Sequence, residues 1–366
     1  MKISQLLDQG IRAHTSRDFA AAESCYRQIL EIMPEHPDAI HFLGVLAHNV
    51  GKYDIAKNYI KRAIELLPGN DACYNNMGNL YQDMKLYSRA VEWYEKTIQL
   101  NPDNVKAYNN MGVAYTKLNQ FDKAKASFNK AVEMNPSYAE AMNNLGEACR
   151  NANEFDRAME WFDRSLKINP NYVEPVWNKA LVLLLLGRFS EGWQAYESRW
   201  QRPGARNRLF DAGQPWQGQD LKDKTIFVYE EQGMGDTLQF IRFLPHLQRL
   251  GAKVIFETLP RMIRLLAGFE GFDRLWVGVK NKDTRPVDRF DFHVPLMSLP
   301  RIFSTELNTI PAQVPYLSPP PGLPEIWGNR VNFPDKLKIG LVWAGSPMHK
   351  NDHNRSIRLG MFKQLK

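Results

Sequence analysis

The turn that contains Gly233, Gly235 and Asp236 has the residue types and the spacing of a ligand-binding site. It follows the apolar stretch 225–229, which predicts a strand, and it precedes a stretch with the period of an amphipathic helix. Backbone N–H groups and the positive end of the helix dipole would face an open crevice at such a turn, which favours an anion or a polar ligand. The turn lacks the lysine and the spacing of a Walker loop, and it is too short for a dinucleotide-binding fingerprint.

Asp236 has two interpretations. As the N-cap of the following helix, its side chain would stabilise that helix by about 1 kcal/mol. As a general base at the mouth of the crevice, a positioned carboxylate would contribute roughly 10²–10⁴ in rate. The spacing alone favours the cap.

A second glycine turn lies near the C-terminus. Gly345 and Ser346 follow a predicted strand, and Arg355 lies ten residues beyond Gly345. Arg355 and Ser356, with Lys350 close by, are candidates for holding phosphate oxygens at this turn, and a solvated loop is the alternative interpretation of these charges. Because His349 and His353 in the same segment have no third ligand nearby, the sequence predicts no metal site there.

His293 lies at the end of a predicted strand near the same crevice. A half-buried structural histidine is the default interpretation of this residue. A contact to the acceptor of a transfer reaction is the weaker alternative.

The elements that must position these residues alternate between strands and helices. The predicted strands are 225–229, 253–257, 274–277, 291–294 and 338–343. Helical stretches such as 237–249 and 261–266 separate them, which predicts an α/β region with a doubly wound, mostly parallel sheet. Such a sheet binds its ligands outside the carboxyl ends of the strands, where the turn at Gly233 lies.

The first two hundred residues repeat with a period of 34. Prolines mark the end of each unit, at Pro34, Pro68, Pro102, Pro136 and Pro170. Glycine, alanine and a bulky apolar residue also recur at fixed positions in each unit, which is typical of an α solenoid of tetratricopeptide (TPR) repeats. A sixth unit, 173–202, has no proline in phase and is predicted to be a capping repeat, with the aromatic rings of Trp193, Tyr196 and Trp200 packed in a core.

One asparagine recurs at the same position of successive units. The recurring residues are Asn76, Asn110, Asn144 and Asn178. An amide both donates and accepts, so such a row on the concave face can pair with the backbone of an extended peptide. The alternative is that asparagine is simply common at this TPR position.

We expect five segments in the chain. They are a TPR solenoid over 1–202, a linker over 203–223, an α/β half over 224–310, a proline-rich hinge over 311–337, and the beginning of a second α/β half over 338–366. One strand and part of a helix cannot bury a core, so the second half is predicted to be truncated or to join the preceding sheet.

Composition narrows the class of protein. The chain has 366 residues, 44% of them hydrophobic, with no apolar run near the roughly 20 residues that span a bilayer. The N-terminus shows no signal peptide, and three scattered cysteines fit a reducing, cytoplasmic location. A net charge of +7 favours acidic partners such as nucleotides, but without long Lys/Arg runs it does not favour nucleic acid.

Several runs in the chain resemble a known family. They are YESRW, EEQGMGDTLQFIRFLPHL, PLMSLPRIF, PYLSPP and GLVWAGSPMHKNDHNRSI. Together they resemble bacterial TPR proteins whose C-terminal region is similar to glycosyltransferase family 9, the heptosyltransferases, and which are often described as similar to O-GlcNAc transferases. The resemblance implies a GT-B fold, with Asp236 as the catalytic base and with Gly345, Ser346 and Arg355 near the phosphates of the donor.

The sequence departs from that family in two respects. Residues 338–357 do not match the histidine-bearing motifs of animal O-GlcNAc transferases, so the resemblance implies neither the sugar nor the acceptor. Only the first βα unit of the second GT-B half is present.

The resemblance therefore implies an enzyme that transfers a sugar from a nucleotide donor to a hydroxyl of a protein held by the TPR repeats. No metal is expected, because the sequence has no DxD motif. The alternatives are a non-catalytic TPR adaptor with a truncated or decayed glycosyltransferase remnant, and a regulatory domain that binds a small molecule.

Overall fold

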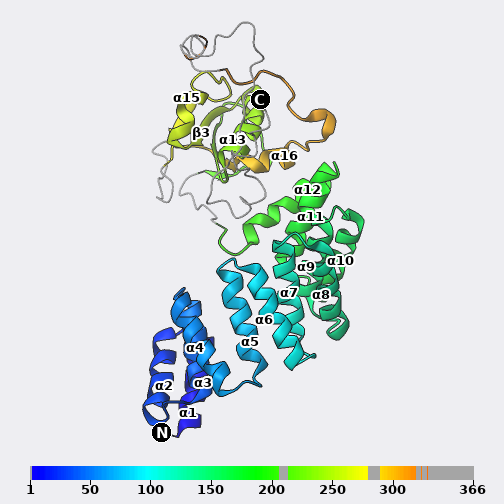
Figure 1. The fold of residues 1–366 in the computed structure, drawn as a ribbon. Helices are drawn as coiled ribbons and strands as arrows, with labels where there is room; N and C mark the ends of the chain where they lie inside the picture. The colour runs from blue at the N-terminus through cyan, green and yellow to red at the C-terminus, as the bar shows by residue number, and fades with distance from the viewer. Residues whose placement is uncertain (1, 206–212, 279–288, 319–322, 324–327, 329–366) are drawn as a thin grey trace. The chain divides into compact units, whose positions relative to one another are not determined.

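The computed structural model describes residues 2–205, 213–278, 289–318, 323 and 328 (Figure 1). The chain divides into two compact units, and the chain crosses between them more than once. Unit 1 consists of Met1–Asp211 and Ser298–Ile310, and unit 2 of Ala212–Met297 and Pro311–Lys366.

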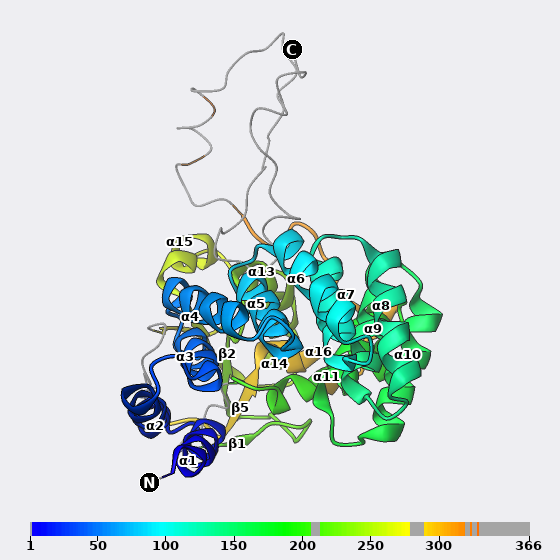
Figure 2. The ribbon, with the colours of Figure 1, turned by 60° about the horizontal axis from the view of Figure 1, so that its bottom comes forward.

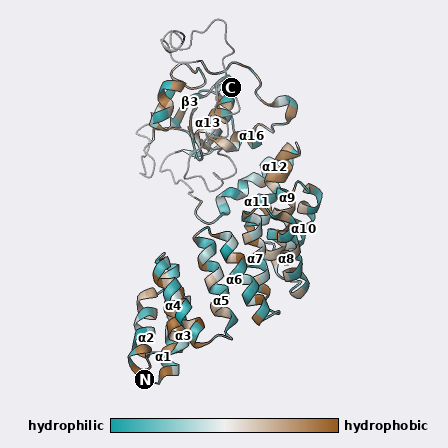
Figure 3. Cartoon of the chain, viewed as in Figure 1, coloured by the Kyte–Doolittle hydropathy of each residue, from teal (hydrophilic) through white to brown (hydrophobic). Residues whose placement is uncertain are grey.

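Unit 1 is a TPR solenoid of twelve consecutive helices, as the 34-residue period predicted. The helices are α1 (Ile3–Thr15), α2 (Phe19–Ile32), α3 (Pro37–Asn49), α4 (Tyr53–Leu66), α5 (Asp71–Asp83), α6 (Tyr87–Leu100), α7 (Val105–Lys117), α8 (Phe121–Met134), α9 (Ala139–Asn151), α10 (Phe155–Ile168), α11 (Val173–Leu185) and α12 (Phe189–Tyr196). Each odd-numbered helix pairs with the helix that follows it, and each pair packs on the next (Figure 2). Apolar and polar residues alternate along the helices, as expected of amphipathic elements with one buried face (Figure 3).

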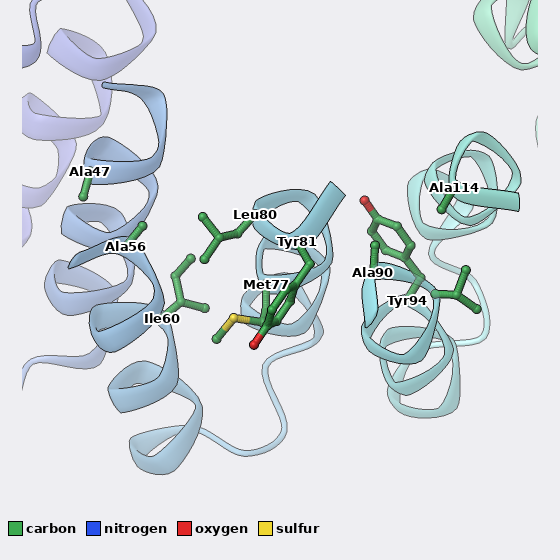
Figure 4. Packing of buried hydrophobic residues seen from close by; sticks show 10 residues of the cluster. Ala47, Ala56, Ile60, Met77, Leu80, Tyr81, Ala90, Tyr94 and Ala114 are labelled. Carbon is green, nitrogen blue, oxygen red and sulfur yellow. The ribbon is translucent and has the colours of Figure 1, made fainter. Parts of the chain in front are cut away.

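The recurring glycines let the two helices of a pair approach closely. A Cβ atom on Gly112 would lie 2.6 Å from the ring of Phe128, and one on Gly44 would lie 2.7 Å from Ile60. Between successive pairs, small and large apolar residues fill a shared core, as in the cluster around Met77 (Figure 4). The spacing of small and bulky residues in the sequence therefore dictates the helix packing.

Each helix pair turns at a residue in the left-handed backbone conformation. These residues share one repeat position: Arg17, Gly51, Lys85, Asn119, Asn153 and Gly187. Their φ angles lie between 59° and 76°. Only two of the six are glycine, so four of the turns hold a side chain in a conformation that L-residues rarely adopt.

The solenoid ends in a short 3₁₀ helix, η1 (Glu197–Gln201), which follows α12 directly. A later segment of the chain, which contains α16 (Leu299–Ile302), packs on α12 as part of unit 1. The solenoid is therefore completed by residues that follow the sheet in the sequence.

Unit 2 contains a five-stranded parallel sheet. The strands are β1 (Gln214–Pro215), β2 (Thr225–Tyr229), β3 (Lys253–Thr258), β4 (Arg274–Val277) and β5 (Phe292–Pro295), in the order β1-β5-β2-β3-β4. In register, Thr225 pairs with Lys253 and Ile255 with Arg274. Four of the predicted strands are found, whereas the fifth, 338–343, and most of the proline-rich stretch lie outside the described residues.

Two expectations for unit 2 need correction. The stretch 203–223 was predicted to be a linker, but it contributes β1 to the edge of the sheet, and its Trp216 side chain is buried. A strand of two residues is too short to show a period in the sequence, so β1 was not predicted. The single helix predicted over 237–249 is divided into α13 (Met234–Phe240), η2 (Ile241–Phe243) and α14 (Leu244–Arg249). Pro245 at the beginning of α14 lacks the N–H that an uninterrupted helix needs.

Candidate functional site

The odd-numbered helices form one continuous face of the solenoid. Between successive pairs, α3 contacts α5, α5 contacts α7, α7 contacts α9, and α9 contacts α11. No two successive even-numbered helices make a comparably extensive contact within the described solenoid. The odd-numbered helices therefore lie on the inner side of the curved stack, and we call their exposed surface the odd-helix face.

The predicted asparagines line up on this face. Each donates its side-chain amide to a residue 35 positions earlier, in the preceding repeat. The bonds are Asn76 Nδ2 to His41 Nε2 (2.9 Å), Asn110 Nδ2 to Asn75 Oδ1 (3.4 Å), Asn144 Nδ2 to Asn109 Oδ1 (3.0 Å) and Asn178 Nδ2 to Asn143 Oδ1 (3.0 Å). We call this row the asparagine ladder.

The amide donors of the ladder hold successive repeats together. This role was not predicted from the sequence. The acceptors Asn109 and Asn143 are 1% and 4% exposed, so their unpaired carbonyl oxygens would be costly. The signal was present in the sequence, because the asparagines occur as adjacent pairs, such as Asn109-Asn110. In each pair, the second asparagine donates its amide to the preceding repeat, and the first asparagine accepts from the amide of the following repeat.

The carbonyl oxygens of the ladder differ in what they bind. Asn178 Oδ1 accepts from Arg150 (2.8 Å), and Asn76 Oδ1 accepts from Asn79 (3.4 Å). Within residues 2–205, the carbonyl oxygens of Asn110 and Asn144 accept no hydrogen bond, and neither is a buried atom. The two middle rungs of the ladder therefore keep an acceptor on the odd-helix face.

The ladder ends at the capping repeat. Trp177 in α11 occupies the position that asparagine has in the preceding units, and its ring lies 4.9 Å from that of Tyr196. The guanidinium of Arg202 lies 4.9 Å from the same indole. Packing against the end of the solenoid thus replaces amide pairing at the last unit.

A buried arginine organises that end. Arg199 is 7% exposed, and its guanidinium lies between the rings of Tyr196 (4.8 Å) and Trp200 (4.7 Å). It donates to Glu197 (2.7 Å) and to the Ser298 hydroxyl (2.7 Å). The aromatic cluster predicted from the sequence therefore packs around the buried guanidinium of Arg199, whose bond to Ser298 joins the segment that begins there to the solenoid.

The second predicted site lies after β2 in unit 2. Gly233, not Asp236, is the N-cap residue of α13, because its backbone is extended (φ −88°, ψ 167°). Asp236 is the third helical residue, and its Oδ2 accepts the N–H of Gly233 at 3.1 Å. Asp236 thus stabilises the helix N-terminus from inside the first turn, and its Oδ1 accepts no hydrogen bond from the described residues.

Glu230 is a residue of this region that the sequence analysis missed. It follows β2 directly, and its Oε2 accepts from the hydroxyls of Thr237 (3.2 Å) and Thr258 (3.4 Å). Burial raises the pKa of Glu230, and the nearby Glu257 carboxylate adds to the effect, although the two hydroxyl bonds oppose it. The sequence alone does not show that Glu230 is buried beside Thr237 and Thr258, so only the fold identifies its role.

The remaining described candidate, His293, is not brought to this turn. His293 is the second residue of β5 and pairs in register with Phe227, so it lies near the beginning of its strand and not at the carboxyl end. Burial lowers the pKa of His293. Gly345, Ser346 and Arg355 lie outside the described residues.

The described residues contain neither a candidate metal site nor a candidate membrane span. No group of three His, Cys, Asp or Glu side chains there is arranged to hold a metal ion. Likewise, none of the helices in that part of the chain is both long and apolar enough to cross a membrane.

Comparison with known proteins identifies the repeats. Three tetratricopeptide-repeat family models match residues 37–70, 72–104 and 109–173. Protein FlbA of Caulobacter vibrioides is 29% identical over 186 residues, which cover 45% of this chain. The match spans 30% of the length of FlbA.

Two solved structures are similar to about half of this chain. PilW, described as a widely conserved type IV pilus biogenesis factor, is 17% identical with a TM-score of 0.50, over 54% of this chain and 92% of PilW. YrrB, described as a TPR protein with an unusual peptide-binding site, is 18% identical with a TM-score of 0.40, over 48% of this chain and 90% of YrrB.

Proposed function

We propose that the chain is a TPR adaptor that holds an extended segment of a partner polypeptide along the odd-helix face. The observation that carries this proposal is the row of acceptor oxygens on the middle rungs, Asn110 and Asn144. Backbone N–H groups of an extended segment can donate to such oxygens without any requirement on its side chains. The inner face of a TPR solenoid is also where these proteins present their binding surface.

The charge of the solenoid supports recognition by hydrogen bonds. Residues 1–205 contain 24 Lys and Arg residues and 24 Asp and Glu residues, so this part of the chain is neutral. The whole net charge of +7 therefore lies beyond residue 205. A neutral solenoid does not steer a charged partner, and its selectivity must come from contacts at short range.

A matched pair of variants tests the proposal. Asn110→Ala combined with Asn144→Ala removes two rungs together with their available oxygens. Asn76→Ala removes a rung whose oxygen is already occupied by Asn79, and so serves as the control for lost packing. The probe is an immobilised panel of unstructured 15-residue peptides of varied sequence, and binding is measured against each variant.

We expect the wild-type chain to bind a subset of the panel and the double variant to bind at least about tenfold more weakly, which corresponds to about 1.4 kcal/mol. The control is expected to bind nearly as well as wild type. Equal losses in both variants would show that the ladder acts only through folding. No binding by the wild-type chain would remove the proposed surface.

Transfer of a sugar from a nucleotide donor is a second candidate function, favoured by one observation in unit 2. Asp236 keeps one carboxylate oxygen available at the N-terminus of α13, beside a glycine turn after the central strand β2. In this candidate, Asp236 takes the proton of an acceptor hydroxyl, and the N–H of Gly235 contacts the sugar donor. The backbone of Gly233, whose N–H is bound by Asp236, lines the site. Gly345, Ser346 and Arg355 would hold the diphosphate in a GT-B arrangement, with no metal.

Thermal stability with UDP, GDP, ADP and CMP, and with their sugars, tests this candidate. A selective rise in melting temperature would identify the donor, because a ligand stabilises the state that binds it. Asp236→Asn keeps a side-chain oxygen for the Gly233 N–H but removes the base. A variant that still transfers sugar would exclude Asp236 as the base, and no shift with any nucleotide would leave only the adaptor function.

We include a cytoplasmic location in the proposal. Cys25, Cys73 and Cys149 are buried and unpaired. Buried free thiols are typical of proteins from reducing compartments. Their redox state in cell lysate, measured by alkylation, tests this assignment.

A further inference from the structure

The histidines of the solenoid are concentrated at its N-terminal end. Four of the eight histidines of the chain are His14, His36, His41 and His48, and none occurs between residues 49 and 245. Three of the four bind a side chain 35 positions later, across a junction between repeats. The bonds are His14 to Asn49 (2.9 Å), His41 to Asn76 (2.9 Å) and His48 to Asp83 (2.8 Å).

His41 takes the place of an asparagine in the ladder. Its repeat position holds asparagine in the next three units, and the bond that it accepts from Asn76 is equivalent to the later amide–amide bonds. The side chain of His41 is buried, with 5% exposure. The first rung of the ladder is therefore titratable near neutral pH, whereas the later rungs are not.

The geometry requires a neutral ring. His41 Nε2 accepts the Nδ2–H of Asn76, so a proton on Nε2 would face the amide NH₂ group. Rotating the amide to present its oxygen would break the bond that this oxygen accepts from Asn79. Protonation of His41 without this rotation removes the bond of the junction, and with the rotation it removes the bond from Asn79 within α5.

We infer that the junction between α3 and α5 is a pH-dependent joint, which loosens when His41 is protonated and releases α1–α4 from the rest of the solenoid. Each repeat contacts only its neighbours, so a weakened junction uncouples the repeats on its N-terminal side. The odd-helix face would then be shorter in acid than at neutral pH. This inference concerns the solenoid alone and does not depend on the proposed peptide binding.

The charged groups around the joint only weakly oppose its loosening in acid. Asp38, on the same helix, favours the protonated ring of His41. From α5, the buried Cys73 faces this region, and burial raises the pKa of its thiol to about 12, so it stays neutral. Asp83, which lies 2.8 Å from His48 across the same junction, has a side chain that is 59% exposed, so water screens its charge.

Burial sets the direction of the pH dependence. It lowers the pKa of both His14 and His41 from the ordinary value of 6.5. The unfolded chain therefore binds protons first as the pH falls below 6.5, and the stability of the junction falls until the pH reaches the pKa of the folded state. Each unit by which the pKa is lowered raises the opening equilibrium constant by up to about tenfold.

Hydrogen exchange of the full chain at pH 7.5 and pH 5.5, corrected for intrinsic exchange rates, tests the inference. We expect amides of α3 and α5 to lose protection at the lower pH by a factor on the order of ten per unit of lowered pKa. Amides of α7–α10 should keep their protection and serve as the internal reference. An equal loss of protection in both regions would contradict the proposal of a joint between α3 and α5.

A substitution distinguishes the joint from general acid unfolding. His41→Asn restores the residue of the other repeats and is expected to abolish the pH difference in α5, whereas α3 still contacts His14 through Asn49. His36→Asn is the matched control, since His36 caps α3 through the N–H of Ala39 (3.3 Å) and crosses no junction. If His41→Asn fails to fold at pH 7.5, His41→Gln provides the same amide on a longer stem. A pH difference that persists in α5 of the folded variant would overturn the inference.

Discussion

The two units of this chain are specified in different ways. In the solenoid, one set of contacts recurs at a fixed offset, so the same few residue types are needed at every repeat and a single period reveals them. In the parallel sheet, no offset recurs: paired residues are 19 positions apart between β3 and β4, 28 between β2 and β3, 66 between β2 and β5, and 78 between β1 and β5. The lesson is that the solenoid is built from local, repeated contacts, whereas the sheet depends on unique ones.

The largest effect that would sharpen this comparison is the loss of a core ring in the solenoid. Phe128→Ala removes a side chain that is 1% exposed, and we expect a loss of about 3–5 kcal/mol in the free energy of unfolding. Hydrogen exchange should show loosening that is strongest in α7–α10 and weak in α1–α2. Uniform loosening throughout the solenoid would contradict the local character of its contacts.

A smaller effect is expected where the solenoid itself depends on a distant segment. Arg199→Ala leaves Glu197 without its buried partner and removes the donor to Ser298, and we expect a cost of about 3 kcal/mol by urea unfolding. The matched control is Arg202→Ala, because the Arg202 side chain is 38% exposed and its ion pair with Glu174 is worth about 1 kcal/mol or less. Equal losses of unfolding free energy in the two variants would show that the buried cluster around Arg199 adds no more stability than an exposed ion pair.

The smallest effect concerns a single carboxylate of the sheet unit. Burial raises the pKa of Glu230, so the folded state binds the proton of this carboxyl more tightly than the unfolded state does. Glu230 therefore destabilises unit 2 progressively as the pH rises above the ordinary pKa of 4.5. Glu230→Gln should therefore flatten the dependence of stability on pH between 4.5 and 7. Denaturant midpoints over this range measure it, and a steeper dependence in the variant would contradict the assignment.

The same contrast explains what the sequence could predict. The solenoid was predicted because Gly112 and its equivalents recur every 34 residues, and four strands were predicted from short apolar runs. The bond from Arg199 to Ser298 and the pairing of β1 with β5 were missed, because they join residues about a hundred and about eighty positions apart with no shared pattern. In the candidate sites, the positions of the ladder asparagines were predicted, but their bonds to the preceding repeat were not.

The fixed offset of the ladder makes the length of the solenoid modular. Each rung joins residues 35 positions apart, one more than the period, so every unit carries one donor for the unit before it and one acceptor for the unit after it. Excision of residues 105–138, one whole unit, would bring α9 next to α6 and place the Asn144 amide opposite the Asn75 carbonyl. The chain could thus gain or lose units by duplication or deletion during evolution without redesigning any contact.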